Sequence, residues 1–259
     1  MFQKVFRMRR REDPAGPPGP ADVLRRVLPI LRRCYGPRRQ PGRQDPVGML
    51  VATILSQNTN DSNSSAGFDA LRRRLTTWDA VADAPLGQVR RCIRVSGLAG
   101  TKAPRIRAIL REIRRRRGRI ELDFLAEMDA DDAFATLTAF KGVGPKTALC
   151  TLLFALGRPV FPVDTHIFRI VRRLGVLAEA VPQARAHEAL TPLIAPRDRY
   201  AMHVLLIAHG RAVCKARVPL CRQCRILHLC PHGRRRMETE WGLDEEEGKE
   251  EQQASRERR

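Results

Sequence analysis

Residues 137–166 read LTAFKGVGPKTALCTLLFALGRPVFPVDTH and contain the turn around which the fold is organised. Apolar residues recur with a helical period on both sides of Gly142 and Gly144, which predicts one helix ending near Phe140 and another starting near Pro145. Glycine permits positive φ and lets another backbone approach closely. The second helix begins with unpaired N–H groups at the positive end of its dipole. The turn therefore favours a phosphate site, with an ordinary interhelical turn as the alternative.

The charge balance points to an anionic partner. The chain has 259 residues, and its 48 Lys plus Arg against 28 Asp plus Glu give a net charge of +20. Such an excess favours nucleic acid, because each neutralised phosphate releases counterions. Solvated charged faces in a chain biased toward Arg are the alternative. Only six of the 48 basic residues are Lys, so Lys146, directly after the glycine turn, indicates a need other than charge.

Helical periodicity extends over most of the chain and predicts an all-α fold. Residues 1–20 form a basic arm rich in Pro and Gly, and residues 233–259 form a densely charged tail. Both are expected to be disordered, because they offer few apolar residues to bury. The expected helices cover residues 23–31, 47–57, 61–75, 85–94, 103–117, 131–140, 146–156, 165–174 and 199–211.

The sequence shows no membrane or export signal. No apolar run approaches the roughly 20 residues that a membrane helix needs, and the N-terminus lacks the apolar segment of a secretory signal. We therefore expect a cytoplasmic protein with no membrane partner. In that compartment the seven cysteines indicate metal binding or catalysis rather than disulfides.

Four cysteines near the end of the chain follow the pattern C-x6-C-x2-C-x5-C. Thiolates so close in sequence predict a metal site. Zinc is the competing interpretation, but zinc ribbons usually combine two C-x2-C knuckles and this segment has one. Cys34, Cys92 and Cys150 lie outside the pattern and are expected to be buried small hydrophobes. The expected metal ligands are Cys214, Cys221, Cys224 and Cys230.

Residues 137–166 resemble the helix-hairpin-helix DNA glycosylases, and most closely the endonuclease III family. The shared features are the Gly-Val-Gly hairpin, Lys146 at the start of the next helix, and Asp164 eighteen residues later in a Val-Asp-Thr-His motif. The cysteine spacing also looks the same as the 4Fe–4S ligand set of that family. Phe140-Lys141 replaces the commoner Leu-Pro, a departure that does not touch the reacting groups. The resemblance covers about residues 21–232.

The resemblance implies two helical domains with a DNA-binding cleft between them. One would comprise residues 39–158 and end with the hairpin. The other would combine residues 21–38 with residues 159–232 and hold the iron-sulfur cluster. In this family the cluster is mainly structural, and the loop between its first two ligands presents basic residues to DNA.

The resemblance also implies a reaction, excision of oxidised pyrimidines with coupled AP lyase activity. Lys146 would attack C1′ of the damaged nucleotide and form a Schiff base, and β-elimination would cut the strand on the 3′ side. Arg could not do this, because a guanidinium stays protonated. Asp164 would stay ionised and stabilise positive charge on the sugar. The alternatives are that Lys146 only binds phosphate and that Asp164 only caps the following helix.

Several DNA contacts follow from the same resemblance. Gln57 or Asn58 would fill the gap left by the everted nucleotide, and a one-residue ambiguity in matching leaves both open. Leu98 stands where the family has an intercalating Leu, with an exposed loop residue as the alternative. Lys215 and Arg217 would contact DNA from the loop after the first metal ligand. The expected partner is double-stranded DNA with damaged bases or abasic sites, bound by a monomer in the bacterial cytoplasm and associated with the nucleoid.

Other functions share this scaffold. Thymine- and adenine-mismatch glycosylases usually lack the Lys at position 146, and 8-oxoguanine glycosylases lack the cysteine pattern. A non-catalytic DNA-binding or damage-sensing module is the alternative of another class, and it would need only positive charge at Lys146.

Overall fold

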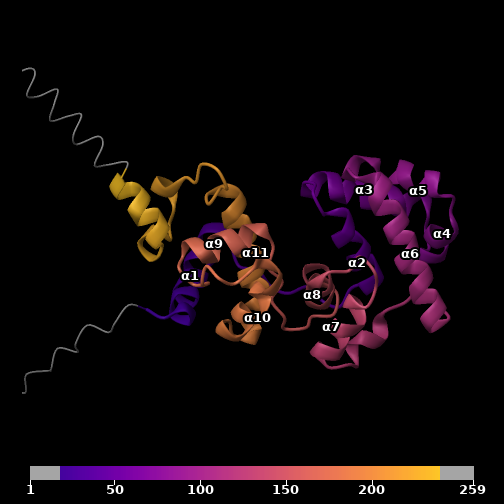
Figure 1. Cartoon of the computed structure of the whole chain (residues 1–259), viewed down its shortest axis with the longest axis horizontal. Coiled ribbons are helices and arrows are strands. Elements are labelled where there is room, and N and C mark those ends of the chain that lie inside the picture. The colour runs from indigo at the N-terminus through magenta and orange to yellow at the C-terminus, as the bar shows by residue number, and fades with distance from the viewer. Residues whose placement is uncertain (1–17, 240–259) are drawn as a thin grey trace, which may run out of the picture.

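The computed structural model describes residues 18–239 as helices joined by turns and short loops (Figure 1). No strand occurs within these residues. The predicted all-α class is confirmed. The helices gather around two separate apolar cores, which appear as two lobes in Figure 1.

The first core lies in the part of the chain that contains the glycine turn. Its central helix, α2, is buried nearly all round, because α3, α6 and α8 all pack against it. We call this part the hairpin domain. Its helices are α2 (Pro46–Leu55), α3 (Asp61–Arg74), α4 (Trp78–Asp83), α5 (Leu86–Cys92), α6 (Ala99–Arg117), α7 (Ala130–Thr138) and α8 (Pro145–Phe154), with the 3-10 turns η1 (Arg94–Ser96) and η2 (Asp123–Ala126).

The second core combines the first helix with the last third of the described chain. Helix α1 buries the apolar face that includes Val23, Val27 and Leu31 and packs against α11. We call this part the cysteine domain and propose the two cores as the two domains of the protein. Its helices are α1 (Pro20–Tyr35), α9 (Thr165–Arg173), α10 (Ala186–Leu190) and α11 (Arg199–Ala212), with the 3-10 turns η3 (Gln183–Arg185), η4 (Thr191–Leu193), η5 (Pro196–Asp198), η6 (Cys221–Gln223) and η7 (Leu227–Leu229).

Helix α6 begins at Ala99, four residues before the predicted start at position 103. The prediction placed Pro104 in the first turn, where a missing N–H costs nothing. In the structure residues 99–102 are helical as well, and Lys102 of this added turn is buried in the core. Pro104 therefore lies inside the helix, beyond its first turn, where a proline normally costs stability. The earlier start places Leu98 at the N-cap of α6.

Residues 231–239 are helical, whereas the sequence predicts no fixed structure from residue 233 onward. The start of this segment is attached to the cysteine loop. Gly233 is buried, its N–H donates to Cys230 Sγ (3.4 Å), and a Cβ there would lie 2.8 Å from Leu227 Cδ1. Charge density alone could not reveal this attachment. The other parts of the expected arm and tail, residues 1–17 and 240–259, lie outside the described residues.

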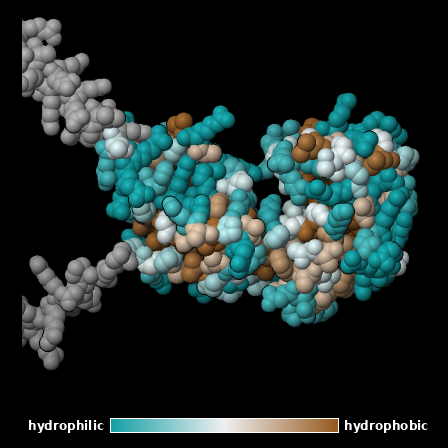
Figure 2. Space-filling view, viewed as in Figure 1, coloured by the Kyte–Doolittle hydropathy of each residue, from teal (hydrophilic) through white to brown (hydrophobic). Residues whose placement is uncertain are grey.

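The face of the molecule seen in Figure 2 is largely hydrophilic and narrows where the two domains meet. Within residues 18–239, none of the helices has the length and apolar character required to span a bilayer.

Candidate active site and cysteine centre

A cavity of about 960 Å³ lies between the two domains. The end of α2, the start of α3 and the helix α8 line it from the hairpin domain, and the α8–α9 connection and α11 line it from the cysteine domain. Lys146 and Asp164 both line this cavity, and so do Gln57 and Asn58. Two pairs of residues that sequence analysis singled out, about 90 residues apart in the chain, are therefore brought to one place.

The turn between α7 and α8 is built on one glycine that requires its conformation and one that does not. Gly142 has φ +93°, and a Cβ there would also lie 2.9 Å from Arg105 Cδ. Gly144 has φ −88°, which any residue adopts, and the space beside it is open. Of the two glycines, Gly142 alone uses the positive φ that glycine permits. What Gly144 offers is free access to the backbone.

Helix α8 starts without a side-chain cap. Gly144 is the N-cap residue, Pro145 takes the first helical position, and no side chain among residues 18–239 caps the first turn. The donors of this turn and the positive end of the helix dipole are therefore available to an anion. Lys146, half-buried, adds its positive charge at the same end.

The floor of the cavity behind Lys146 includes Cys150, one turn further along α8. Burial raises the pKa of the Cys150 thiol, and the nearby Lys146 ammonium opposes this only in part. Cys150 is buried as the sequence predicts. The prediction is wrong for Cys34, which is exposed, and Cys92 is half-buried. Cys34 lies at the end of α1, beyond the face that packs on the core.

Asp164 caps helix α9. Its Oδ1 accepts a hydrogen bond from the Ile167 N–H (2.8 Å), so the capping role weighed in the sequence analysis is present. That bond uses one carboxylate oxygen, and the residue also lines the cavity.

A side chain that sequence analysis did not single out, His203, holds the connection between α8 and α9. His203 on α11 is buried, burial lowers its pKa, and its Nδ1 lies 2.9 Å from the Pro162 carbonyl, to which the neutral ring donates.

The structure separates Gln57 from Asn58. Gln57 is half-buried and already bound: its Oε1 accepts from Arg105 Nη1 (2.9 Å) and its Nε2 donates to Thr147 Oγ1 (3.3 Å). Asn58 is exposed, has φ +53°, and its side chain makes no hydrogen bond within residues 18–239. Gln57 thus ties α2 to α8, and Asn58 projects from the turn.

Leu98 lies on a second turn of the hairpin domain. It is 55% exposed, a large value for a leucine, and has φ +50°. Close behind it, Lys102 is 2% exposed and donates from Nζ to the carbonyls of Leu55 and Ser96, both at 2.7 Å. Burial lowers the pKa of Lys102. Sequence analysis missed this residue, and the available signal was its place among only six lysines.

The basic loop after Cys214 is attached to α9. Lys215 and Arg217 are exposed on it. Arg173 donates from Nη1 to the Lys215 carbonyl (2.8 Å) and from Nη2 to the Ala216 carbonyl (2.9 Å). The helix that begins after Asp164 therefore also fixes the backbone of the basic loop.

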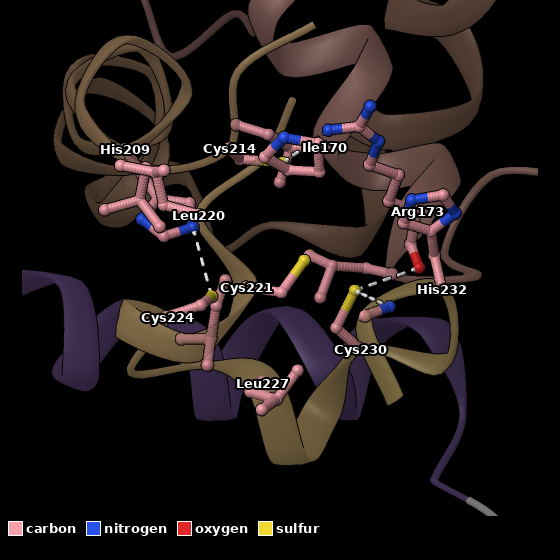
Figure 3. A pocket seen from close by; sticks show the side chains of 15 residues that line it. Ile170, Arg173, His209, Cys214, Leu220, Cys221, Cys224, Leu227, Cys230 and His232 are labelled. Atoms are coloured by element: carbon pink, nitrogen blue, oxygen red, sulfur yellow. Dashed lines mark hydrogen bonds between the residues drawn. The ribbon is translucent and has the colours of Figure 1, made fainter. Parts of the chain in front are cut away.

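Cys214, Cys221, Cys224 and Cys230 line a single small cavity with apolar neighbours (Figure 3). Nitrogen groups face three of the sulfurs: Arg173 Nη1 lies 3.2 Å from Cys214 Sγ, Gly233 N 3.4 Å from Cys230 Sγ, and His209 Nε2 3.6 Å from Cys224 Sγ. Donors of this kind suit thiolates.

The four thiols of this centre are the kind of ligand that a zinc ion or an iron–sulfur cluster uses. Among residues 18–239, no three His, Cys, Asp or Glu side chains lie close enough together to hold a single metal ion. Burial raises the pKa of Cys224 to about 11 and also raises that of Cys230. Thiols in such surroundings lose their protons when a metal centre takes the place of the proton. Four thiols around a shared cavity could bind a metal centre in this way, each replacing its proton with a bond to the metal.

A family model, curated relatives and solved structures all match this chain, and they agree with one another. A family model described as HhH-GPD superfamily base excision DNA repair protein matches residues 51–196. A candidate DNA glycosylase of Arabidopsis thaliana is 35% identical over 68% of this chain, which spans 57% of that protein. Endonuclease III of Sulfolobus acidocaldarius is 35% identical over 71% of this chain and 80% of its own length. The solved structure of a non-covalent endonuclease III–DNA complex superposes with a TM-score of 0.72 at 27% identity, covering 84% of this chain and 98% of that one.

Proposed function

Since the chain belongs to the endonuclease III family of DNA glycosylases, within the HhH-GPD superfamily of base excision DNA repair proteins, we propose that it is a bifunctional glycosylase and AP lyase acting on oxidised pyrimidines in duplex DNA. The observation that carries the proposal is the shared cavity. Lys146 and Asp164 stand at the starts of two helices in different domains, and both line it.

In this proposal, DNA is bound by the uncapped start of α8 and by the basic loop after Cys214. A phosphate would approach the uncapped start of α8 beside Gly144, where no side chain blocks the N–H groups. Lys215 and Arg217 would neutralise further phosphates from the basic loop. These contacts position the duplex so that an everted nucleotide enters the cavity between the domains.

In the chemical steps, the Lys146 ammonium first gives up a proton to solvent, and the resulting amine attacks C1′ of the everted nucleotide. The bond between C1′ and the base breaks, and the base leaves with the electron pair and takes up a proton. The nitrogen lone pair then forms the Schiff base C1′=N as the C1′–O4′ bond breaks, and O4′ takes up the second proton of the amine. Loss of a proton from C2′ then expels the 3′ phosphate and cuts the strand. Lysine supplies this chemistry, whereas an arginine at 146 would stay protonated.

Asp164 supports the first step electrostatically. As the base leaves, the sugar gains positive charge, and a carboxylate in the same cavity stabilises it more in the transition state than in the ground state. The hydrogen bond from the Ile167 N–H fixes the orientation of the carboxylate.

Asn58 and Leu98 are the residues that we propose to enter the duplex. The hydrogen bonds of Gln57 favour Asn58 in this role, because Gln57 would have to break two hydrogen bonds to reach the DNA. Leu98 offers an exposed apolar side chain on a separate turn. Together they would fill the gap left by the everted nucleotide and separate its neighbours.

The substrate range is tested with a panel of duplexes that each carry one lesion. We expect release of oxidised pyrimidines with cleavage 3′ to the lesion, and no release from undamaged DNA. Release of thymine or adenine from mismatches alone would favour a mismatch glycosylase. DNA binding without release from any duplex would favour the non-catalytic module.

We further propose that Cys214, Cys221, Cys224 and Cys230 hold a 4Fe–4S cluster. When bound, the cluster would act structurally, since four cysteine ligands at a 4Fe–4S cluster leave no open coordination position. The residues of this chain then do the rest: Arg173 joins the first ligand to the basic loop, and Gly233 joins the last ligand to the helical segment that follows.

The purified protein is expected to be brown and to contain iron and acid-labile sulfide at about four each per chain. Cys224→Ser should lower both contents. Cys92→Ser, which changes a half-buried cysteine outside the set, is the matched control and should leave them unchanged. One zinc per chain and no sulfide would contradict the cluster.

A further inference from the structure

Lys102 is buried between the two segments that we propose to enter the DNA. Its Nζ holds the carbonyl of Leu55, the last residue of α2, and the carbonyl of Ser96, the last residue of η1. Asn58 follows three residues after the first carbonyl, and Leu98 follows two residues after the second. Lys102 does not itself line the cavity between the domains, so it does not contact a nucleotide bound there.

The same two segments contain an uncommon backbone conformation. Within residues 18–239, Asn58 and Leu98 are the only residues other than glycine with positive φ. Such conformations cost energy and persist where the surrounding structure holds them, often at functional sites. Lys102 also holds Leu98 through its backbone, because its N–H donates to the Leu98 carbonyl (2.9 Å).

A further contact, between α3 and η1, joins the same two segments. Helix α3 packs so closely on η1 that a Cβ at Gly67 would lie 1.9 Å from Ser96 Oγ. Ser96 Oγ in turn donates to the Asn63 carbonyl on α3 (3.3 Å). The turn before α3 and the turn before α6 are therefore fixed to one another, with the Lys102 ammonium at the centre.

From these contacts we propose that Lys102 is a positioning residue, which fixes the turn of Asn58 and the turn of Leu98 relative to each other so that both side chains enter the duplex together. The proposal rests on the glycosylase function proposed above. It also explains why a lysine stands here in a chain that otherwise uses Arg. A compact ammonium offers three donors and reaches two carbonyls inside the core, which a planar guanidinium fits poorly.

The test replaces Lys102 with Met, which has similar length and no donors. In single-turnover assays, base release from an oxidised-pyrimidine duplex is expected to fall by about tenfold or more, because eversion of a stacked base needs both side chains. Cleavage at a preformed abasic site should change by less than about threefold, since no base has to leave the stack there. The ratio of the two rates is the diagnostic quantity.

Leu110→Ala is the matched control, because Leu110 is fully buried on the same helix and belongs to the general core of the hairpin domain. It should lower stability without changing that ratio, which separates positioning from mere loss of stability. Lys102→Gln, which reaches one carbonyl at most, should give an intermediate ratio. It carries the test if Lys102→Met does not fold.

The outcomes distinguish the two proposals. If the wild-type protein releases no base, the proposed function fails. If it releases base and both Lys102 variants keep the wild-type ratio, only the positioning role is overturned. Amide hydrogen exchange in the wild-type protein gives a reading that needs no variant: residues 56–59 and 97–99 should open together at matching rates, and clearly different rates would overturn the role.

Discussion

Replacing Lys146 with Arg is expected to abolish borohydride trapping of the protein on DNA and strand cleavage at abasic sites. The substitution keeps a positive charge at the uncapped start of α8, so attraction to phosphate survives and DNA affinity should stay within about threefold of wild type. The nucleophilic amine is lost, because a guanidinium stays protonated and forms no Schiff base. Trapping on an abasic duplex, measured beside equilibrium binding, separates the two effects.

Lys141→Arg is the matched control for this experiment. Lys141 is exposed in the same hairpin, and the change is chemically identical. Trapping and cleavage should continue in this variant at the wild-type rate. If the Lys146→Arg protein traps as well as the wild type, Lys146 is not the nucleophile and the proposed chemistry fails.

Replacing Asp164 with Asn should reduce base release by roughly 100-fold or more, because the negative charge that faces the developing positive charge is removed. Asn is as good a helix N-cap as Asp, so the bond to the Ile167 N–H and the stability of α9 should be preserved. Single-turnover base release and thermal unfolding of the same sample test both statements.

Asp164→Ala completes the comparison. This variant loses the charge and the cap, so it should release base as slowly as Asp164→Asn and unfold more easily, by about 1 kcal/mol. Wild-type rates in the Asn variant, together with a loss of stability in the Ala variant, would reduce Asp164 to a capping residue.

The features that were predicted well from the sequence are those determined by short, local stretches of residues. The glycine turn, the flanking helices and the all-α class depend on local periodicity, and the structure has them where expected. The boundaries depended on tertiary packing and were less accurate. Helix α6 starts at Ala99, one turn earlier than predicted, and this turn brings Lys102 into the core, while residues 231–239 form a helix that is attached to the cysteine loop.

The site was predictable residue by residue only where spacing carried the information. Lys146 and Asp164 could be named from one motif, although their common cavity requires the structure. The choice between Gln57 and Asn58 depends on hydrogen bonds to Arg105 and Thr147, which lie far away in sequence. Lys102 was missed for the same reason, because the carbonyls it holds belong to two other segments.

The packing of α1 against α11 determines the order in which the two domains can fold during synthesis on the ribosome. Helices α2 to α8 are complete once the chain reaches Phe154, whereas the partners of α1 come much later, ending with α11 at Arg199–Ala212. At about 5–20 residues per second, the apolar face of α1 waits on the order of 10 s for its partners. During this time a chaperone has access to Val23, Val27 and Leu31, and the four thiols emerge only after α11. A metal centre at the four cysteines would therefore assemble only after all the helices of the hairpin domain have been synthesised.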